Sequence, residues 1–149
     1  MHLPRRGPLA TGQGVATIAR RAEELGFDSL WTGDHVAFPW QEPKDYHYTS
    51  SGRMTWSPTT PWADPFVSLT WAGALTSRIK LGTSILVLAM RSPVVVAKSV
   101  ATLDLYTGGR VILGVGAGWL EAEYELAGQP FIDRGPRTTE AIRLLKACW

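Results

Sequence analysis

Two polar side chains, Asp34 and His35, directly follow a short apolar run at residues 27–32 that is typical of a buried strand. The pKa of histidine lies near neutrality, so an imidazole beside a carboxylate in a pocket can move a proton or orient a substrate oxygen. The alternative is a histidine that only hydrogen-bonds its own loop. We take His35 as the candidate catalytic residue.

Residues 110–119 read Arg-Val-Ile-Leu-Gly-Val-Gly-Ala-Gly-Trp, a branched apolar run that leads into alternating glycines. This pattern is typical of a buried strand whose end brings its backbone close to a flat or anionic group. A dinucleotide fingerprint requires a third glycine at position 119, where this chain has Trp119. The run therefore favours approach to a cofactor ring over a pyrophosphate turn, and a glycine-rich turn without a ligand is the alternative.

Other kinds of site find little support in the sequence. The histidines at 2 and 47 have no ligand spacing to His35, so we predict no metal site. Ser57 and Ser84 lack the context of a nucleophile elbow, which argues against a hydrolytic triad. The net charge of +2 argues against nucleic acid as a partner.

The composition is that of one soluble globular domain, with 149 residues, 45% hydrophobic and 19% charged. The single cysteine, Cys148, excludes an internal disulfide and is consistent with a reducing compartment. No apolar run is long enough to span a membrane, and the N-terminus lacks the apolar segment of a secretory signal. We therefore expect a cytoplasmic protein with a small-molecule substrate and no membrane partner.

Helical and strand patterns alternate strictly along the chain. The expected helices cover residues 15–25, 64–76, 92–107 and 136–149, with a short acidic helical turn around 120–127. The expected strands are apolar runs at 27–32, 79–87 and 110–115. This alternation predicts parallel strands covered by helices, either in a doubly wound open sheet or in a (β/α)8 barrel. Both architectures place function at the carboxyl ends of the strands, here 33–35, 84–90 and 116–119.

The stretch 33–63 is too long for an ordinary connection between a strand and a helix. Its aromatic residues are Trp40, Tyr46, Tyr48, Trp56 and Trp62. We predict an active-site lid that packs over the carboxyl ends of the strands and is ordered in part by its aromatic side chains. A disordered polar insertion is the alternative.

Three runs resemble the bacterial luciferase-like superfamily. Residues 20–35 resemble its first βα repeat, and residues 79–86 with Arg91-Ser92-Pro93 resemble its third strand and the helix that follows. Residues 110–119, followed by Glu121, Glu123 and Tyr124, resemble its fourth strand. Within the superfamily the chain is most similar to actinobacterial-type oxidoreductases that use the deazaflavin coenzyme F420. FMN-dependent monooxygenases share the same motifs less closely.

The resemblance implies a luciferase-like TIM (β/α)8 barrel with the tricyclic cofactor ring at the carboxyl ends of its strands. It places His35 beside the reactive carbon of the ring and a non-proline cis peptide between Ser84 and Ile85. The cofactor-binding residues that it implies are Asp34, Ser84, Ile85, Ala117 and Gly118. Trp40 and Trp119 would line the substrate side. Some sugar-phosphate dehydrogenases of the family have a catalytic glutamate where this chain has Trp119.

Only Leu3-Pro4 remains of the family's opening strand, and the sequence ends in the family's fourth helix. We therefore expect residues 1–149 to form about the first four βα units of a barrel, inactive alone, and a homo-oligomer when complete. The inner faces that would then lack partners carry Leu30, Leu81, Ile85, Ile112 and Leu113.

The expected reaction is hydride transfer between the deazaflavin and a small organic substrate. The alternatives are an FMN-dependent monooxygenase and a half-barrel without catalytic activity.

Overall fold

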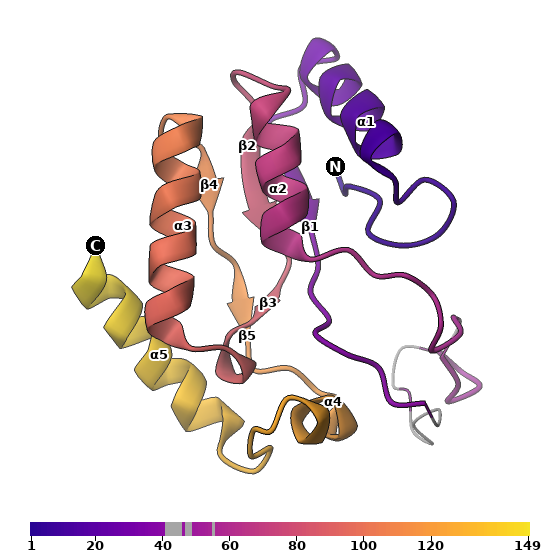
Figure 1. Cartoon of the computed structure of the whole chain (residues 1–149), viewed down its shortest axis with the longest axis vertical. Helices are drawn as coiled ribbons and strands as arrows, with labels where there is room; N and C mark the ends of the chain where they lie inside the picture. The colour runs from indigo at the N-terminus through magenta and orange to yellow at the C-terminus, as the bar shows by residue number, and fades with distance from the viewer. Residues whose placement is uncertain (41–45, 47–48, 55) are drawn as a thin grey trace.

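The computed structural model describes residues 1–40, 46, 49–54 and 56–149 (Figure 1). Its helices are α1 (Gly12–Glu24), α2 (Pro65–Ala74), the 3-10 turn η1 (Leu88–Met90), α3 (Pro93–Thr107), α4 (Glu121–Leu126) and α5 (Arg134–Cys148). Its strands are β1 (Ser29–Thr32), β2 (Lys80–Thr83), β3 (Leu86–Val87), β4 (Val111–Ile112) and β5 (Val115–Gly116). The predicted alternation of helices and strands is confirmed. The run 79–87 is divided into β2 and β3, and the run that begins at 110 into β4 and β5.

All described strands run parallel, as predicted. β1, β2 and β4 form one sheet in that order, with Leu30 opposite Leu81 and Leu81 opposite Val111. β3 and β5 continue the chain segments of β2 and β4 as a second parallel pair. The N-terminal residues add a parallel bridge between His2 and Trp31 beside β1. The protein is therefore an α/β structure in which four chain segments run in the same direction.

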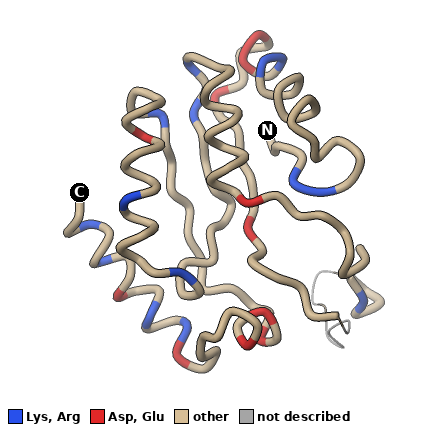
Figure 2. Tube along the Cα trace, viewed as in Figure 1, with Lys and Arg blue, Asp and Glu red and all other residues tan. Residues whose placement is uncertain are grey.

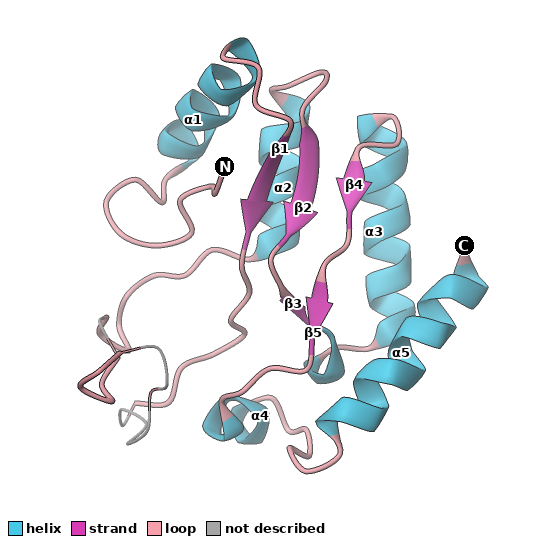
Figure 3. Ribbon diagram, turned by 180° about the vertical axis from the view of Figure 1, so that it is seen from behind, coloured by secondary structure: helices cyan, strands magenta, loops and turns pink. Residues whose placement is uncertain are grey.

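The helices cover one face of this sheet. α2 and α3 lie in front of the strands in Figure 1 and behind them in Figure 3, where the other face carries no described helix. α2 packs on β1 and β2, and α3 packs on β4. The apolar core lies between these two layers. No helix in the described ranges is long and apolar enough to cross a membrane.

Our expectation that Leu30 and Leu81 face the uncovered side is wrong. Both are fully buried in the cluster between the sheet and helices α1 and α2. Because successive side chains of a strand point to opposite faces, Trp31 and Gly82 take the uncovered side, where the indole lies over the glycine. β1 (Ser-Leu-Trp-Thr) and β2 (Lys-Leu-Gly-Thr) each carry polar residues on both alternating sides, so their sequences do not show which side packs against the helices. Ile85 and Ile112, in contrast, are exposed at 38% and 36%.

Local capping groups explain where the helices begin and end. The Thr11 hydroxyl accepts a hydrogen bond from the Gly14 N–H (3.0 Å), and the Asp64 carboxylate accepts from the first turn of α2. Gly108, at a φ of 70°, ends α3 in the left-handed conformation that favours glycine. These helix ends direct the chain into the strands that carry the site.

The amino ends of the strands are held by two charged side chains. The Glu23 carboxylate, on α1, accepts from the N–H groups of Ser77, Arg78 and Ile79, just before β2. The Arg110 guanidinium donates to carbonyl oxygens at the end of α2, before β2 and at the end of α3. Charged residues are otherwise spread over the helices and loops (Figure 2). These side chains thus stabilise the amino ends of the strands, and the candidate site lies at the opposite, carboxyl ends.

Candidate active site

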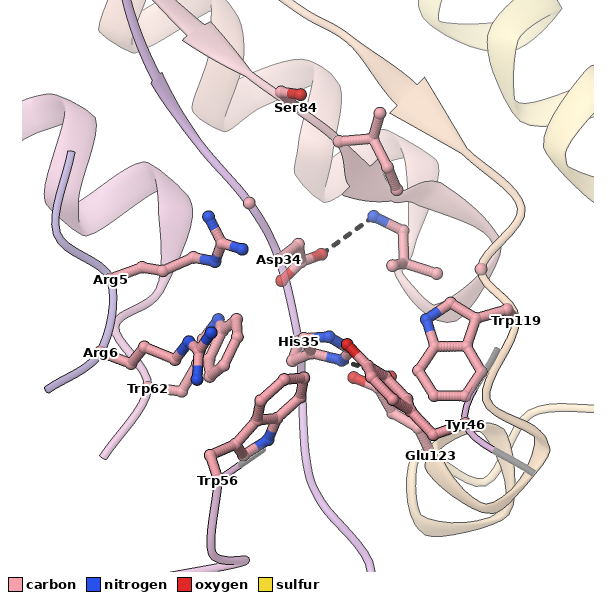
Figure 4. A pocket seen from close by; sticks show the side chains of 14 residues that line it. Arg5, Arg6, Asp34, His35, Tyr46, Trp56, Trp62, Ser84, Trp119 and Glu123 are labelled. Carbon is pink, nitrogen blue, oxygen red and sulfur yellow. Dashed lines mark hydrogen bonds and ion pairs between the residues drawn. The ribbon is translucent and has the colours of Figure 1, made fainter. Parts of the chain in front are cut away.

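A pocket of about 330 Å³ lies at the carboxyl ends of the parallel strands (Figure 4). Of the residues named from the sequence, it brings together Asp34, His35, Ser84, Ile85, Gly118 and Trp119. Trp40 lies outside this lining, with 80% of its surface exposed. Ala117 also lies outside it, and its carbonyl accepts a hydrogen bond from the Tyr124 hydroxyl.

His35 is fixed by a carboxylate from a distant part of the chain. Its Nδ1 lies 3.0 Å from Oε2 of Glu123 on α4, and the two side chains are only 13% and 2% exposed. The other oxygen of Glu123 accepts from the N–H groups of Val36 and Ala37. An ionised carboxylate is only an acceptor, so this contact places the ring proton on Nδ1 and leaves Nε2 as the acceptor of a neutral ring.

Glu123 was named from the sequence only as part of a family motif, and its place in the candidate site was not predicted. The sequence offered Asp34 as the carboxylate beside His35, but the structure pairs the histidine with a residue 88 positions away. The available signal was the short acidic segment after Trp119, in which Glu123 and Tyr124 are buried while Glu121 and Glu125 are exposed. A spacing argument cannot connect that segment to the end of β1.

Asp34 lines the pocket, and both of its carboxylate oxygens already have protein partners. One accepts from the Val87 N–H at 3.0 Å, and Arg91 bonds both oxygens at 2.8 and 3.3 Å. Although burial lowers the pKa of Arg91, hydrogen bonds and the negative charges of Asp34 and Asp64 outweigh burial and raise it. Asp34 therefore holds β3 and the start of α3 in place beside the pocket.

The peptide bond between Ser84 and Ile85 is cis, as the resemblance implied. Both residues line the pocket, between β2 and β3.

The spaces beside the glycines of the run 110–119 are filled by protein atoms. A Cβ on Gly114 would lie 2.3 Å from the Thr83 carbonyl oxygen, and one on Gly116 would lie 2.9 Å from Ile85 Cδ1. A Cβ on Gly118 would lie 2.7 Å from a methyl group of Val87. Close packing between strands thus accounts for the alternation of glycines without a ligand, while Gly118 still lines the pocket.

Aromatic side chains surround His35. The ring centroid of His35 lies 4.6 Å from that of Phe38, 4.9 Å from Trp62 and 6.5 Å from Trp119. The ring centroids of Trp56 and Trp62 lie 5.4 Å apart, with the two ring planes tilted at 49°. The described part of the stretch 33–63 therefore contributes aromatic side chains to the wall of the pocket, at the carboxyl ends of the strands. Tyr48, named with these residues in the sequence, lies outside the described residues.

Arg5 and Arg6 complete the pocket, from the segment between the N-terminal bridge and α1. The Arg5 guanidinium lies 5.1 Å from the ring centroid of Trp62, and that of Arg6 lies 4.4 Å from Trp56. Such distances give attractive cation–π contacts. No role for this basic pair was predicted from the sequence.

Comparison with known proteins gives consistent matches. The family model for luciferase-like monooxygenases matches residues 3–149. An F420-dependent glucose-6-phosphate dehydrogenase of Kineococcus radiotolerans is 40% identical over 140 residues, which cover 91% of this chain and 36% of that protein. The solved structure of an F420-dependent secondary alcohol dehydrogenase with an F420–acetone adduct matches with a TM-score of 0.70 and 30% identity. The match covers 93% of this chain and 38% of that one.

A further structure shares the fold alone. It is a monooxygenase from Streptomyces bottropensis, with a TM-score of 0.74 and 22% identity, covering 100% of this chain and 42% of that one. The chain spans less than half the length of the curated relatives that it matches. Because the family model covers nearly the whole sequence, the chain belongs to the family of luciferase-like monooxygenases.

Proposed function

We propose that this chain forms the part of an oxidoreductase active site at which a hydride passes between the deazaflavin coenzyme F420 and a small organic substrate. The observation that carries the proposal is the His35–Glu123 pair, held in an aromatic pocket at the carboxyl ends of the strands. Similarity to two F420-dependent dehydrogenases supports the choice of cofactor.

The residues present fit a flat, partly polar ring. The side chain of Ile85 is 38% exposed and offers an apolar surface beside Ser84 and Gly118. The indoles of Trp56, Trp62 and Trp119 provide further flat walls. We assign the ring contacts to Asp34, Ser84, Ile85, Ala117 and Gly118, of which Ala117 would act through its backbone. When bound, the deazaflavin supplies or accepts the hydride at its C5 carbon.

His35 would hold or accept the proton that accompanies hydride transfer. With Nδ1 fixed by Glu123, Nε2 is the ring atom left to exchange a proton with a substrate hydroxyl or carbonyl oxygen. Glu123 acts as a positioning residue, because it holds both the ring and the backbone at 36–37. The aromatic wall would exclude water from the reacting atoms.

We infer further that the parallel segments are the first four strands of a (β/α)8 barrel. The uncovered face of the sheet supports this inference, because an all-parallel sheet normally has both faces covered. In the same proposal the stretch 33–63 acts as a lid. Trp40 would reach the substrate side, next to Trp119, through closure of that lid.

The test is a histidine substitution in the full natural protein. We expect His35→Ala to lower turnover by about 10²–10⁴-fold, with a nearly unchanged Kd for coenzyme F420. Reduction and oxidation of the cofactor are followed by its violet absorbance, and binding by its fluorescence. Turnover within a few-fold of wild type would remove His35 from the reaction.

The second candidate function is an FMN-dependent monooxygenase, favoured by the description of the matched family. Reconstitution of the same protein with coenzyme F420 or FMN separates the two. The deazaflavin proposal expects tight binding of coenzyme F420 and reduction without uptake of oxygen. Tight binding of FMN with substrate-dependent oxygen uptake would favour the monooxygenase.

A further inference from the structure

The basic pair at 5–6 gives the candidate pocket a positive side. Figure 4 shows Arg5 and Arg6 reaching toward the pocket from the same segment, which lies between the N-terminus and α1 (blue in Figure 2). Both guanidinium groups are partly buried and lie over the indoles of Trp62 and Trp56. Arginine stacked on an aromatic ring is held flat, with its N–H groups directed outward from the stack.

These two charges have no acidic partner within the ranges that the structure describes. The two carboxylates that line the same pocket, Asp34 and Glu123, form their hydrogen bonds with other groups. Asp34 pairs with Arg91, and Glu123 bonds His35 and two backbone N–H groups. With His35 neutral, the Glu123 carboxylate offsets one of these two positive charges, and the charged groups that the structure describes around the pocket keep a net positive charge.

Unsatisfied hydrogen-bond donors belong to the same residues. Nε of Arg5, Nε1 of Trp56 and Nε1 of Trp62 are buried without a hydrogen-bond partner among the described atoms. A buried donor without a partner is unfavourable, so such groups are rare unless a ligand or ion completes them. All three are donors only, and the complementary ligand is therefore an acceptor. Burial, followed by the charge of Arg6, also lowers the pKa of Arg5, and a bound anion would offset both effects.

We propose that Arg5, Arg6, Trp56 and Trp62 form an oxyanion subsite that binds a carboxylate or phosphate group. As an extension of the proposed function, this subsite orients the substrate by its anionic group while His35 faces the reacting carbon. The oxidoreductase would then prefer anionic substrates. The same oxyanion chemistry could also come from the acidic tail of the cofactor, and the experiment separates these two sources.

The first arm needs neither cofactor nor turnover. The chain is titrated with inorganic phosphate and with benzoate at constant ionic strength, and a change in the tryptophan fluorescence, to which Trp56 and Trp62 contribute, reports binding. We expect saturable binding that weakens by about 10- to 100-fold in the double variant Arg5→Gln/Arg6→Gln. The Arg5→Lys/Arg6→Lys variant keeps the charge and should bind with intermediate affinity.

The matched control is Arg20→Gln, an exposed arginine on α1 that removes the same charge away from the pocket. It should bind phosphate like the wild type, and circular dichroism verifies that each variant is folded. Absence of saturable binding by the wild type would overturn the subsite. Equal affinity in the wild type and the folded glutamine variant would also overturn it.

The second arm measures the Kd of coenzyme F420 with and without saturating phosphate. An unchanged Kd assigns the oxyanion to the substrate, and a raised Kd assigns it to the tail of the cofactor. If neither coenzyme F420 nor FMN binds, the proposed function fails, while the phosphate titration still decides the subsite.

Discussion

At the scale of single residues, the site depends on contacts that no local pattern encodes. Glu123 satisfies one ring nitrogen of His35 and two backbone N–H groups with its two oxygens. One carboxylate therefore fixes both the orientation of the histidine ring and the start of a long loop. It also explains why a glutamate is buried on the short helix α4.

Replacement of Glu123 by glutamine tests this arrangement. Glutamine has one acceptor oxygen, so it cannot accept from both the ring and the loop, and its amide would favour a proton on Nε2 of His35. We expect turnover to fall by at least about tenfold and the ring tautomer to change in nitrogen-15 NMR spectra. Glu121→Gln, exposed on the same helix, is the control. Wild-type turnover and tautomer in Glu123→Gln would refute the positioning role.

Tyr124 gives a second residue-scale prediction. Its hydroxyl donates to the Ala117 carbonyl, and the residue is fully buried beside Gly118. Burial also raises the pKa of Tyr124. Tyr124→Phe leaves that carbonyl without its donor, so we expect the free energy of unfolding to fall by about 1–3 kcal/mol. Urea denaturation measures the change. A loss below about 0.3 kcal/mol would mean that the bond contributes little.

At the scale of elements, the strands are held at their amino ends by side chains and at their carboxyl ends by packing against glycine. Glu23 joins α1 to the start of β2 through three backbone N–H groups. Burial acts to raise the pKa of Glu23, but the hydrogen bonds from Ile79, Arg78 and Ser77 outweigh it, and the pKa is lowered.

This lowered pKa predicts the pH dependence of a Glu23→Gln variant. A carboxyl group with a lower pKa in the folded state contributes stability above its unfolded-state pKa and loses it as the pH falls through the folded-state pKa. We expect Glu23→Gln to be less stable by about 1 kcal/mol at pH 7, with the difference vanishing in acid. Glu24→Gln removes only an exposed pair with Arg21 and should change stability little at either pH. A pH-independent difference would contradict the prediction.

The glycine run predicts unequal effects of alanine substitution. A Cβ at Gly114 meets a backbone oxygen at 2.3 Å, whereas one at Gly116 meets the flexible end of Ile85 at 2.9 Å. We expect Gly114→Ala to destabilise the chain by about 3 kcal/mol or more and Gly116→Ala by about 1 kcal/mol. Thermal unfolding of the two variants compares them directly. Equal effects would show that the backbone at 114 can move.

At the scale of the whole molecule, the features that could be predicted from the sequence are those that short stretches of chain determine. The order of the elements and the parallel direction of the strands could be predicted from the helix ends at Asp64 and Gly108 and from the apolar runs. The side of the sheet on which Leu30 and Leu81 lie was not predictable, because β1 (Ser-Leu-Trp-Thr) and β2 (Lys-Leu-Gly-Thr) carry polar residues on both of their alternating sides. The link between Glu123 and His35 and the place of Arg5 in the pocket both depend on long-range packing, which a spacing argument does not reach.

The uncovered face of the sheet leads to the last prediction. Helices cover the sheet on one side only in the described chain, and Ile112 and Trp31 lie on the other side. Apolar sheet faces and unpaired strand edges associate with one another. We expect the 149-residue chain, expressed alone, to form oligomers at micromolar concentration in analytical ultracentrifugation. Ile112→Asp should shift it toward monomer, because a buried unpaired carboxylate is unfavourable.

The control for this prediction is Leu105→Asp, which adds the same charge on the outer side of α3, where Leu105 is 77% exposed. If the open face of the sheet drives association, Leu105→Asp leaves the oligomer intact. Dissociation by Leu105→Asp but not by Ile112→Asp would instead place the contact on the helices. A monomeric wild-type chain would contradict the prediction, because the uncovered face of the sheet would then be stable in water without a second layer.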